Sequence, residues 1–178
     1  MLHRGCDNTA VIDAMIHAAE QPETVQKLVL VDIGCEFSQT ESEIPQRPWV
    51  FADYRELEAF ERSVNPYAAL WTMRPGLRAE YREHDGKLVR KHDPVYAARW
   101  PFRNMTYWDY AQRVSCPVLL LRGGESFVLS PEMAEKTAGS IADCRLVEIP
   151  DTGHAVFLDN PPVFLQALRQ FLDEFLDG

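Results

Sequence analysis

The chain of 178 residues suits one domain with a substantial core. Its 27 acidic residues outnumber 18 basic ones, and the net charge of −9 argues against nucleic acid and anionic membranes as partners, because both attract clustered positive charge. No apolar run is long enough to cross a bilayer and no secretion signal is visible, so we expect a cytoplasmic protein.

The first elements expected in chain order are a helix and a strand. Residues Thr9–Glu20 place apolar side chains at helical spacing, and Pro22 ends the pattern. Residues Leu28–Asp32 (LVLVD) form a nearly continuous apolar run. Such a run is typical of a strand in a parallel sheet that is covered on both faces.

The middle of the chain, residues 36–113, predicts a mainly helical insertion. It holds 14 of the 19 aromatic residues and is too long for a loop and too apolar for a linker. Its helical patterns are broken, over Tyr54–Ser63, Pro66–Arg74 and Pro75–His84, and a turn is expected at His84–Gly86. We interpret it as a cap over the strand ends, where ligands bind in α/β folds. The alternative is a second packing layer without a pocket.

The last third of the chain returns to an alternation of strand and helix. Strands are expected over Val118–Arg122 and Arg145–Ile149, with a helix between them and a final helix from Asn160. This order predicts an α/β fold, with a few-stranded parallel sheet built from residues 1–35 and 114–178.

The spacing of cysteine and histidine predicts no metal site. Cys6, Cys35, Cys116 and Cys144 form no C-x-x-C pair, and the five histidines show no H-E-x-x-H pattern. We therefore expect reduced, mostly structural thiols of a cytosolic protein.

Four segments together resemble the C-terminal part of an α/β-hydrolase with a cap domain. They are PETVQKLVLVDIG (22–34), the aromatic insertion, CPVLLLRGGESFVLSPE (116–132) and IPDTGHAVFLDNPPVFLQALRQFL (149–172). The resemblance implies a triad in which a histidine activates a nucleophile and an acid orients the histidine. It also implies a hydrolase that needs no cofactor.

His154 matches the histidine of this family through its Gly-His pair and its distance from the last strand. The usual acid position, after the penultimate strand, is occupied by Phe127, which cannot accept a hydrogen bond from an imidazole. Dehalogenases of the family keep the acid at the end of an earlier strand, where this chain has Asp32. Asp32 is therefore the candidate acid, with Glu125 as the alternative. Many relatives carry an aspartate at the Asp32 position without using it, and this non-catalytic alternative stays open. A loop histidine bonded to backbone is the non-catalytic alternative for His154.

The nucleophile is the least defined position of the triad. The elbow pattern of the family, G-x-S-x-G, needs small residues around the nucleophile. Counting back along the first helix places Asn8 at the nucleophile position, and asparagine is no nucleophile. A shift of one residue gives Gly5–Thr9 (GCDNT) with Asp7 at its centre, which is the arrangement of dehalogenases and epoxide hydrolases. The alternative is that Asp7 only caps the helix. Cys6 is disfavoured because Arg4 would crowd the elbow.

The first strands of the family and its oxyanion loop have no counterpart here, so the chain resembles a truncated hydrolase. The strand over Leu28–Asp32 then becomes an apolar sheet edge, which invites pairing with a second copy of the chain. Oxyanion stabilisation is also compromised.

The function that these features predict is hydrolysis of a small apolar ester, epoxide or halide held against the cap. Trp100 and Trp108 are the candidate pocket walls, and core packing is the alternative role for each. The other class of function that fits is a catalytically inactive remnant that acts as a binding or interaction module. The sequence names neither the substrate nor the true nucleophile.

Overall fold

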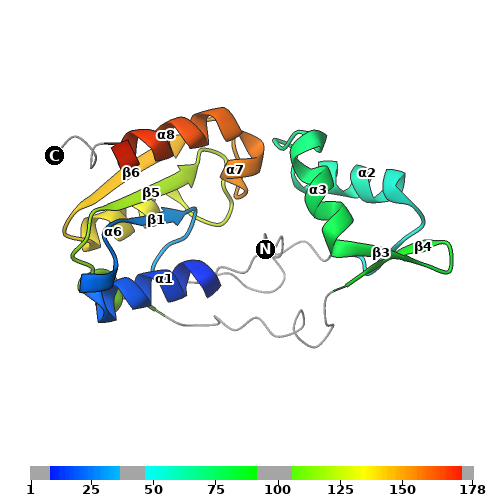
Figure 1. Cartoon of the computed structure of the whole chain (residues 1–178). Helices are drawn as coiled ribbons and strands as arrows, with labels where there is room; N and C mark the ends of the chain where they lie inside the picture. Colours follow the sequence, from blue (N-terminus) through cyan, green and yellow to red (C-terminus); the bar gives the residue numbers. More distant parts are fainter. Residues whose placement is uncertain (1–8, 37–46, 92–105, 174–178) are drawn as a thin grey trace.

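The computed structural model describes residues 9–36, 47–91 and 106–173, which form a parallel sheet with its helices and a smaller antiparallel unit (Figure 1). Residues 47–91, for which the name cap is kept below as a label, lie to one side of the parallel sheet, next to α7 (Val156–Asp159). Over the described ranges, no helix combines the length and apolar character that crossing a membrane requires.

The parallel sheet has the strand order β1-β5-β6, formed by Leu28–Val31, Val118–Gly123 and Cys144–Ile149. In the register, Val118 lies opposite Leu28 on one side and opposite Cys144 on the other. Every residue of the central strand β5 is buried, which explains its continuous apolar run. The predicted strands and the α/β fold class are confirmed, with strand ends that differ by one residue.

Alternate residues of β5 point to opposite faces of the sheet. Val118 and Leu120 pack in a cluster with α1 (Thr9–Glu20), α5 (Trp108–Ala111) and α6 (Pro131–Ser140). Leu119 and Leu121 pack on the other face with α7 and α8 (Pro161–Asp173). Figure 1 shows α8 on one side of the sheet and α1 on the other, with the short 3-10 helix η1 (Pro22–Thr24) before β1.

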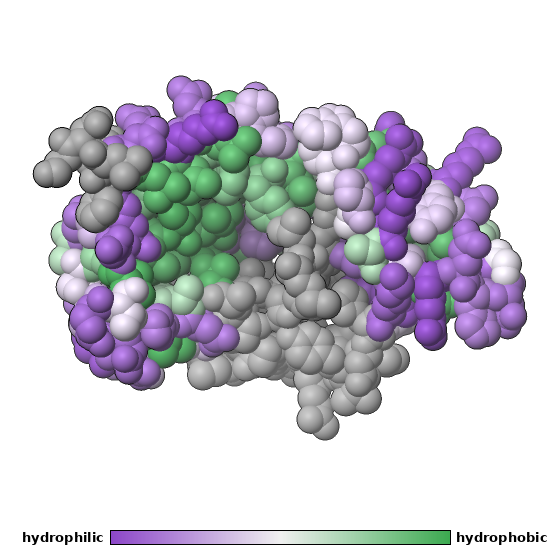
Figure 2. All heavy atoms as spheres, in the orientation of Figure 1, coloured by the Kyte–Doolittle hydropathy of each residue, from purple (hydrophilic) through white to green (hydrophobic). Residues whose placement is uncertain are grey.

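Strand β1 lies at the edge of the sheet among the described residues. Its Val29 and Val31 are only partly buried. Figure 2 shows an apolar area over this part of the molecule, between α8 and α1. Pairing of this edge with a second copy of the chain stays a prediction.

The cap contains two helices, α2 (Tyr54–Val64) and α3 (Leu70–Glu80). The predicted helix over Tyr54–Ser63 is confirmed. The predicted break at Pro75 is wrong, because α3 continues through it. Met73 and Leu77, on either side of Pro75, are both buried in one apolar cluster, and this packing outweighs the low helix propensity of proline.

The cap also contains a three-stranded antiparallel sheet in the order β2-β4-β3, formed by Val50–Phe51, Lys87–Arg90 and Tyr81–His84. The helical pattern predicted to reach His84 is therefore wrong over β3. Asp85 and Gly86 both have positive φ, 49° and 70°, which is the two-residue turn that suits a hairpin. The predicted turn is confirmed, and it joins two strands.

The cap meets the core at α7. Leu158 of α7 packs against the apolar cluster of the cap, and a side chain added at Gly153 would touch the ring of Tyr67. Tyr107 and Ala111 of the insertion pack instead in the core cluster with α1. The division into a core of residues 1–35 and 114–178 and a cap of residues 36–113 stays a prediction.

Candidate active site

Asp32 follows β1 at the carboxyl end of the parallel sheet, where strand ends of this fold class collect functional residues. Its side chain is fully buried, and its φ of 51° is uncommon for a residue other than glycine. Its backbone N–H donates to the carbonyl of Leu121 at 2.7 Å, which continues the pairing of β1 with β5. The carboxylate is thus held rigidly at the strand end.

Three groups converge on the Asp32 carboxylate. The backbone N–H of Gly123 donates to Oδ1 at 2.9 Å, and the Ser126 hydroxyl donates to Oδ2. The Nδ1 atom of His154 lies 2.7 Å from Oδ2. A buried carboxylate is tolerated only when its oxygens are hydrogen-bonded, and these partners meet that requirement.

The loop that carries His154 follows β6 and is tied to the loop after β5. Thr152 is buried, its hydroxyl donates to the carbonyl of Ile149, and its own carbonyl accepts from the N–H of Glu125 at 2.8 Å. A Cβ atom at Gly123 would lie 2.1 Å from the carbonyl oxygen of Gly153. Only glycine therefore allows the two loops to approach closely enough for Asp32 and His154 to meet.

The geometry fixes the tautomer of the neutral imidazole. An ionised carboxylate can only accept, so His154 carries its hydrogen on Nδ1 and its lone pair on Nε2. The His154 side chain is 21% exposed, whereas the Asp32 side chain is fully buried. A partly exposed imidazole backed by a buried carboxylate is the arrangement of a general base.

The alternative acid and the residue at the usual acid position are both exposed. Glu125 is exposed, and Phe127, at the usual acid position of the resembled family, is 56% exposed. Asp32 is the carboxylate that lies within hydrogen-bond distance of the imidazole. The structure therefore brings together two of the predicted site residues, Asp32 and His154.

The other predicted site residues either lie outside the described part of the chain or make packing contacts. Asp7, Cys6, Asn8 and Trp100 lie outside the described residues. Trp108 lies in α5, where its Nε1–H donates to Glu36 at 3.3 Å, Lys136 lies over its ring, and it packs against the core cluster. These are the contacts of a packing residue, and a role for Trp108 as a pocket wall stays a prediction.

Ser126 and Asp159 are site residues that the sequence analysis missed. Ser126 donates to Asp32, and Asp159 accepts the N–H of Gly153. The Ser126 signal lies in the segment RGGES, where a serine follows a strand end and two glycines. Asp159 follows His154 by five residues, on a separate short helix, and no spacing rule marks it.

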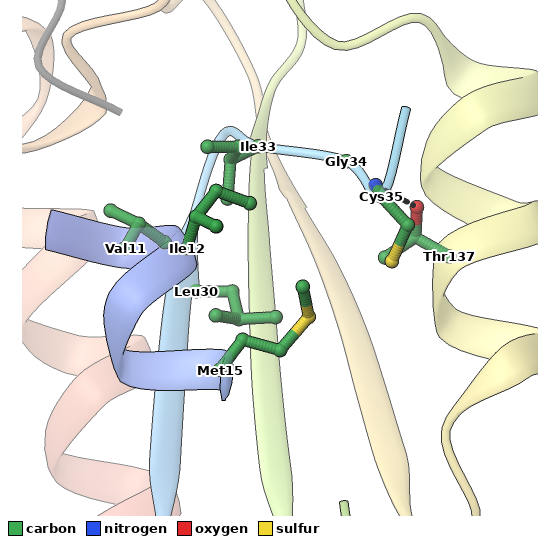
Figure 3. A pocket seen from close by; sticks show the side chains of 8 residues that line it. All are labelled: Val11, Ile12, Met15, Leu30, Ile33, Gly34, Cys35 and Thr137. Atoms are coloured by element: carbon green, nitrogen blue, oxygen red, sulfur yellow. Dashed lines mark hydrogen bonds between the residues drawn. The ribbon is translucent and has the colours of Figure 1, made fainter. Parts of the chain in front are cut away.

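A small apolar hollow lies on the α1 face of the sheet, between α1 and β1 (Figure 3). Met15, Leu30 and Cys35 are among its lining residues, and neither Asp32 nor His154 is. Burial raises the pKa of the Cys35 thiol to about 11, so this thiol is not a nucleophile near neutral pH. The hollow is a gap in core packing rather than a place for substrate.

The sequence is similar to two curated esterases, and no protein-family model matches it. It is 29% identical over 170 residues to esterase Rv0045c of Mycobacterium tuberculosis, covering 88% of this chain and 55% of the relative. It is 27% identical over 162 residues to the pimeloyl-[acyl-carrier protein] methyl ester esterase of Chromobacterium violaceum, covering 88% and 64%. The chain thus spans about half to two thirds of the length of these relatives.

The fold is similar to that of solved hydrolases. The structure of E-2-(acetamidomethylene)succinate hydrolase matches with a TM-score of 0.80 and 23% identity, over 90% of this chain and 62% of that one. Structures that bear the name α/β-hydrolase are among the further matches. At these identities the structural likeness establishes the fold alone.

Proposed function

We propose that this chain, which belongs to the α/β-hydrolase superfamily, is part of a hydrolase in which Asp32 and His154 form the acid–base pair. The observation that carries the proposal is the 2.7 Å contact between His154 Nδ1 and the fully buried Asp32. The hydrogen bonds from Gly123 and Ser126 to the same carboxylate support it, because they keep Asp32 in place to orient the imidazole.

In the proposed reaction, His154 Nε2 takes the proton of the attacking hydroxyl group as that oxygen bonds to the carbonyl carbon of an ester. The carbonyl oxygen becomes the oxyanion, and Asp32 stabilises the imidazolium that forms. The carbon–oxygen bond to the leaving group then breaks, and His154 returns the proton to the leaving alkoxide. The acyl group now on the attacking oxygen is released by water, which His154 activates in the same way, so the carboxylic acid leaves and the hydroxyl group is restored. His154 is thus base and acid in turn.

The substrate class that we propose is a small apolar ester, because both curated relatives are named as esterases. Epoxides and halides are the alternatives, and they would suit Asp7 as nucleophile. Its carboxylate would attack the saturated carbon and form a covalent ester; the epoxide oxygen would take up a proton from water as its C–O bond breaks, and a halogen would leave as the halide ion. Water activated by His154 would then hydrolyse that ester. Trp100 and Trp108 are the proposed pocket walls.

Hydrolysis by the purified chain beside its His154→Ala variant tests the proposal. The panel consists of activated short-chain acyl esters, an epoxide and a haloacid. We expect turnover that falls about 10²–10⁴-fold in His154→Ala. His84→Ala is the matched control, because this histidine lies at the exposed end of the cap hairpin with 59% of its side chain accessible, and we expect it to keep full activity.

Two results would contradict the proposal. One is turnover that His154→Ala retains. The other is a folded sample with no activity on any substrate of the panel, which would favour a non-catalytic binding module. The substrate that responds distinguishes an ester mechanism from attack by a carboxylate.

A further inference from the structure

Asp159, the last residue of α7, holds the backbone next to His154. Its Oδ2 accepts the N–H of Gly153 at 2.8 Å, and Gly153 directly precedes the histidine. The imidazole is therefore fixed from two directions. Asp32 binds its Nδ1, and Asp159 binds the backbone N–H of the residue directly before it.

The second oxygen of the Asp159 carboxylate is buried and accepts no hydrogen bond within the described part of the chain. The pKa of this carboxyl group is raised, chiefly by burial; the Gly153 N–H and the charge of His154 lower it, and the charge of Asp32 raises it further. Asp159 therefore lies within electrostatic reach of both members of the acid–base pair. A buried carboxylate that lacks a donor for one oxygen is costly, so it calls for a compensating role.

The cap fixes the same short helix from its other side. Leu158, next to Asp159, packs into the apolar cluster of the cap. A side chain at Gly153 would lie 3.4 Å from the Tyr67 ring and 3.5 Å from Asp159 Oδ2. Asp159 thus sits where the cap and the His154 loop meet, and it has little freedom to turn away.

We propose that Asp159 is a positioning residue for His154, which anchors the histidine loop through Gly153 and adds a second negative charge to that of Asp32 beside the imidazole. Among the described residues, Asp32 from the end of β1 and Asp159 from α7 are two carboxylates whose charges act on His154. Two carboxylates stabilise the imidazolium more than one does, and this is the protonated state that a general base passes through. The inference rests on the proposed function of His154 as the base.

The test is an NMR titration of the His154 imidazole in the full chain, with hydrogen exchange of the Gly153 amide as a second readout. Asp159→Asn keeps an oxygen that can accept the Gly153 N–H but removes the charge. We expect the pKa of His154 to fall by about half a unit or more in this variant, with Gly153 protection retained. Asp159→Ala removes both, and we expect at least tenfold faster exchange at Gly153 as well.

Asp151→Asn is the matched control. Asp151 lies three residues before His154 in the same loop but is exposed, and asparagine tolerates its positive φ of 57° as aspartate does. An imidazole titration that Asp159→Asn leaves equal to that of Asp151→Asn would overturn the proposal. Because the titration needs no turnover, an inactive chain with the expected shift would refute the hydrolase and leave the positioning role standing. Turnover that depends on His154, together with an unchanged titration, would support the hydrolase and overturn the positioning role of Asp159.

Discussion

The core and the cap each bury a carboxylate, and the two differ in the partner that the carboxylate receives. In the core, Asp32 is fully buried and contacts His154, whose imidazole can both accept and donate a proton. In the cap, Glu61 is 2% exposed and pairs with Arg47 and with the amide of Asn65. Arginine stays protonated, so this pair cannot move a proton.

Burial of a charged group therefore does not by itself mark a catalytic site. What distinguishes Asp32 is a titratable partner that is partly exposed, and a position at the carboxyl ends of parallel strands. The Glu61 network lies on α2 in a unit whose sheet is antiparallel, and its role is to hold that unit together. Paired substitutions in the two regions test this distinction.

The largest effect is expected from Asp32→Asn. The amide keeps the shape of the carboxylate but no longer stabilises an imidazolium or fixes the Nδ1–H tautomer. If the chain hydrolyses a substrate of the panel, we expect kcat to fall about 10³–10⁴-fold. Glu61→Gln is the matched change in the cap and should leave kcat within a few-fold of the unmodified chain. Equal losses in the two variants would erase the distinction between the regions.

A large effect on stability is expected from Gly123→Ala. The added Cβ would lie 2.1 Å from the backbone oxygen of Gly153, so the two loops of the site must move apart. We expect a loss of about 2–4 kcal/mol in the free energy of unfolding, measured by denaturant titration. In Gly139→Ala, on α6, the new methyl group meets nothing within 4 Å. We expect a gain of about 0.5–1 kcal/mol there, and a similar gain in Gly123→Ala would refute the close approach.

An intermediate effect is expected from Glu61→Gln on the stability of the cap. The amide retains an acceptor for Asn65 but weakens the pair with Arg47, whose side chain is 24% exposed. We expect a loss of about 1–3 kcal/mol in the free energy of unfolding. Glu83→Gln, an exposed position on β3, serves as the control and should change little. An unchanged stability in Glu61→Gln would show that the buried pair contributes nothing to the cap.

The sequence predicted the core better than the cap, for a physical reason. A strand covered on both faces is an almost continuous run of apolar residues, so LVLV and the VLLL of β5 could be recognised without knowledge of their neighbours. The resemblance to the α/β-hydrolase superfamily is confirmed by the fold and by the curated relatives. The pairing of Asp32 with His154 could be expected because both residues follow strands of one parallel sheet.

The cap was harder to predict from the sequence because its strands are short and polar. The segment YREH of β3 has one buried residue and looks helical when it is read after α3. The Asp85-Gly86 pair was the signal for a hairpin, since both residues favour positive φ. In the site, the roles of Ser126 and Asp159 could not be predicted from the sequence, because their contacts with Asp32 and Gly153 join loops that only tertiary packing brings together. The nucleophile remains the Asp7 prediction, outside the described residues.

The smallest effect is expected from Glu58→Gln, on the same helix as Glu61 but with a less buried side chain, 22% exposed against 3%. Both oxygens of Glu58 accept from Arg74, and this hydrogen bonding lowers the pKa of the Glu58 carboxyl group. A lowered pKa means that the pair stabilises the folded chain above the pKa of the unfolded glutamate, and that this contribution disappears as the pH falls through the lowered value. Because Arg74 is exposed, solvent and salt screen the pair. In denaturant titrations at pH 7, Glu58→Gln should therefore lose less free energy of unfolding than Glu61→Gln does. The loss in Glu58→Gln should fade in 1 M NaCl and below pH 4. A loss as large as that of Glu61→Gln would mean that exposure does not separate the two ion pairs of α2.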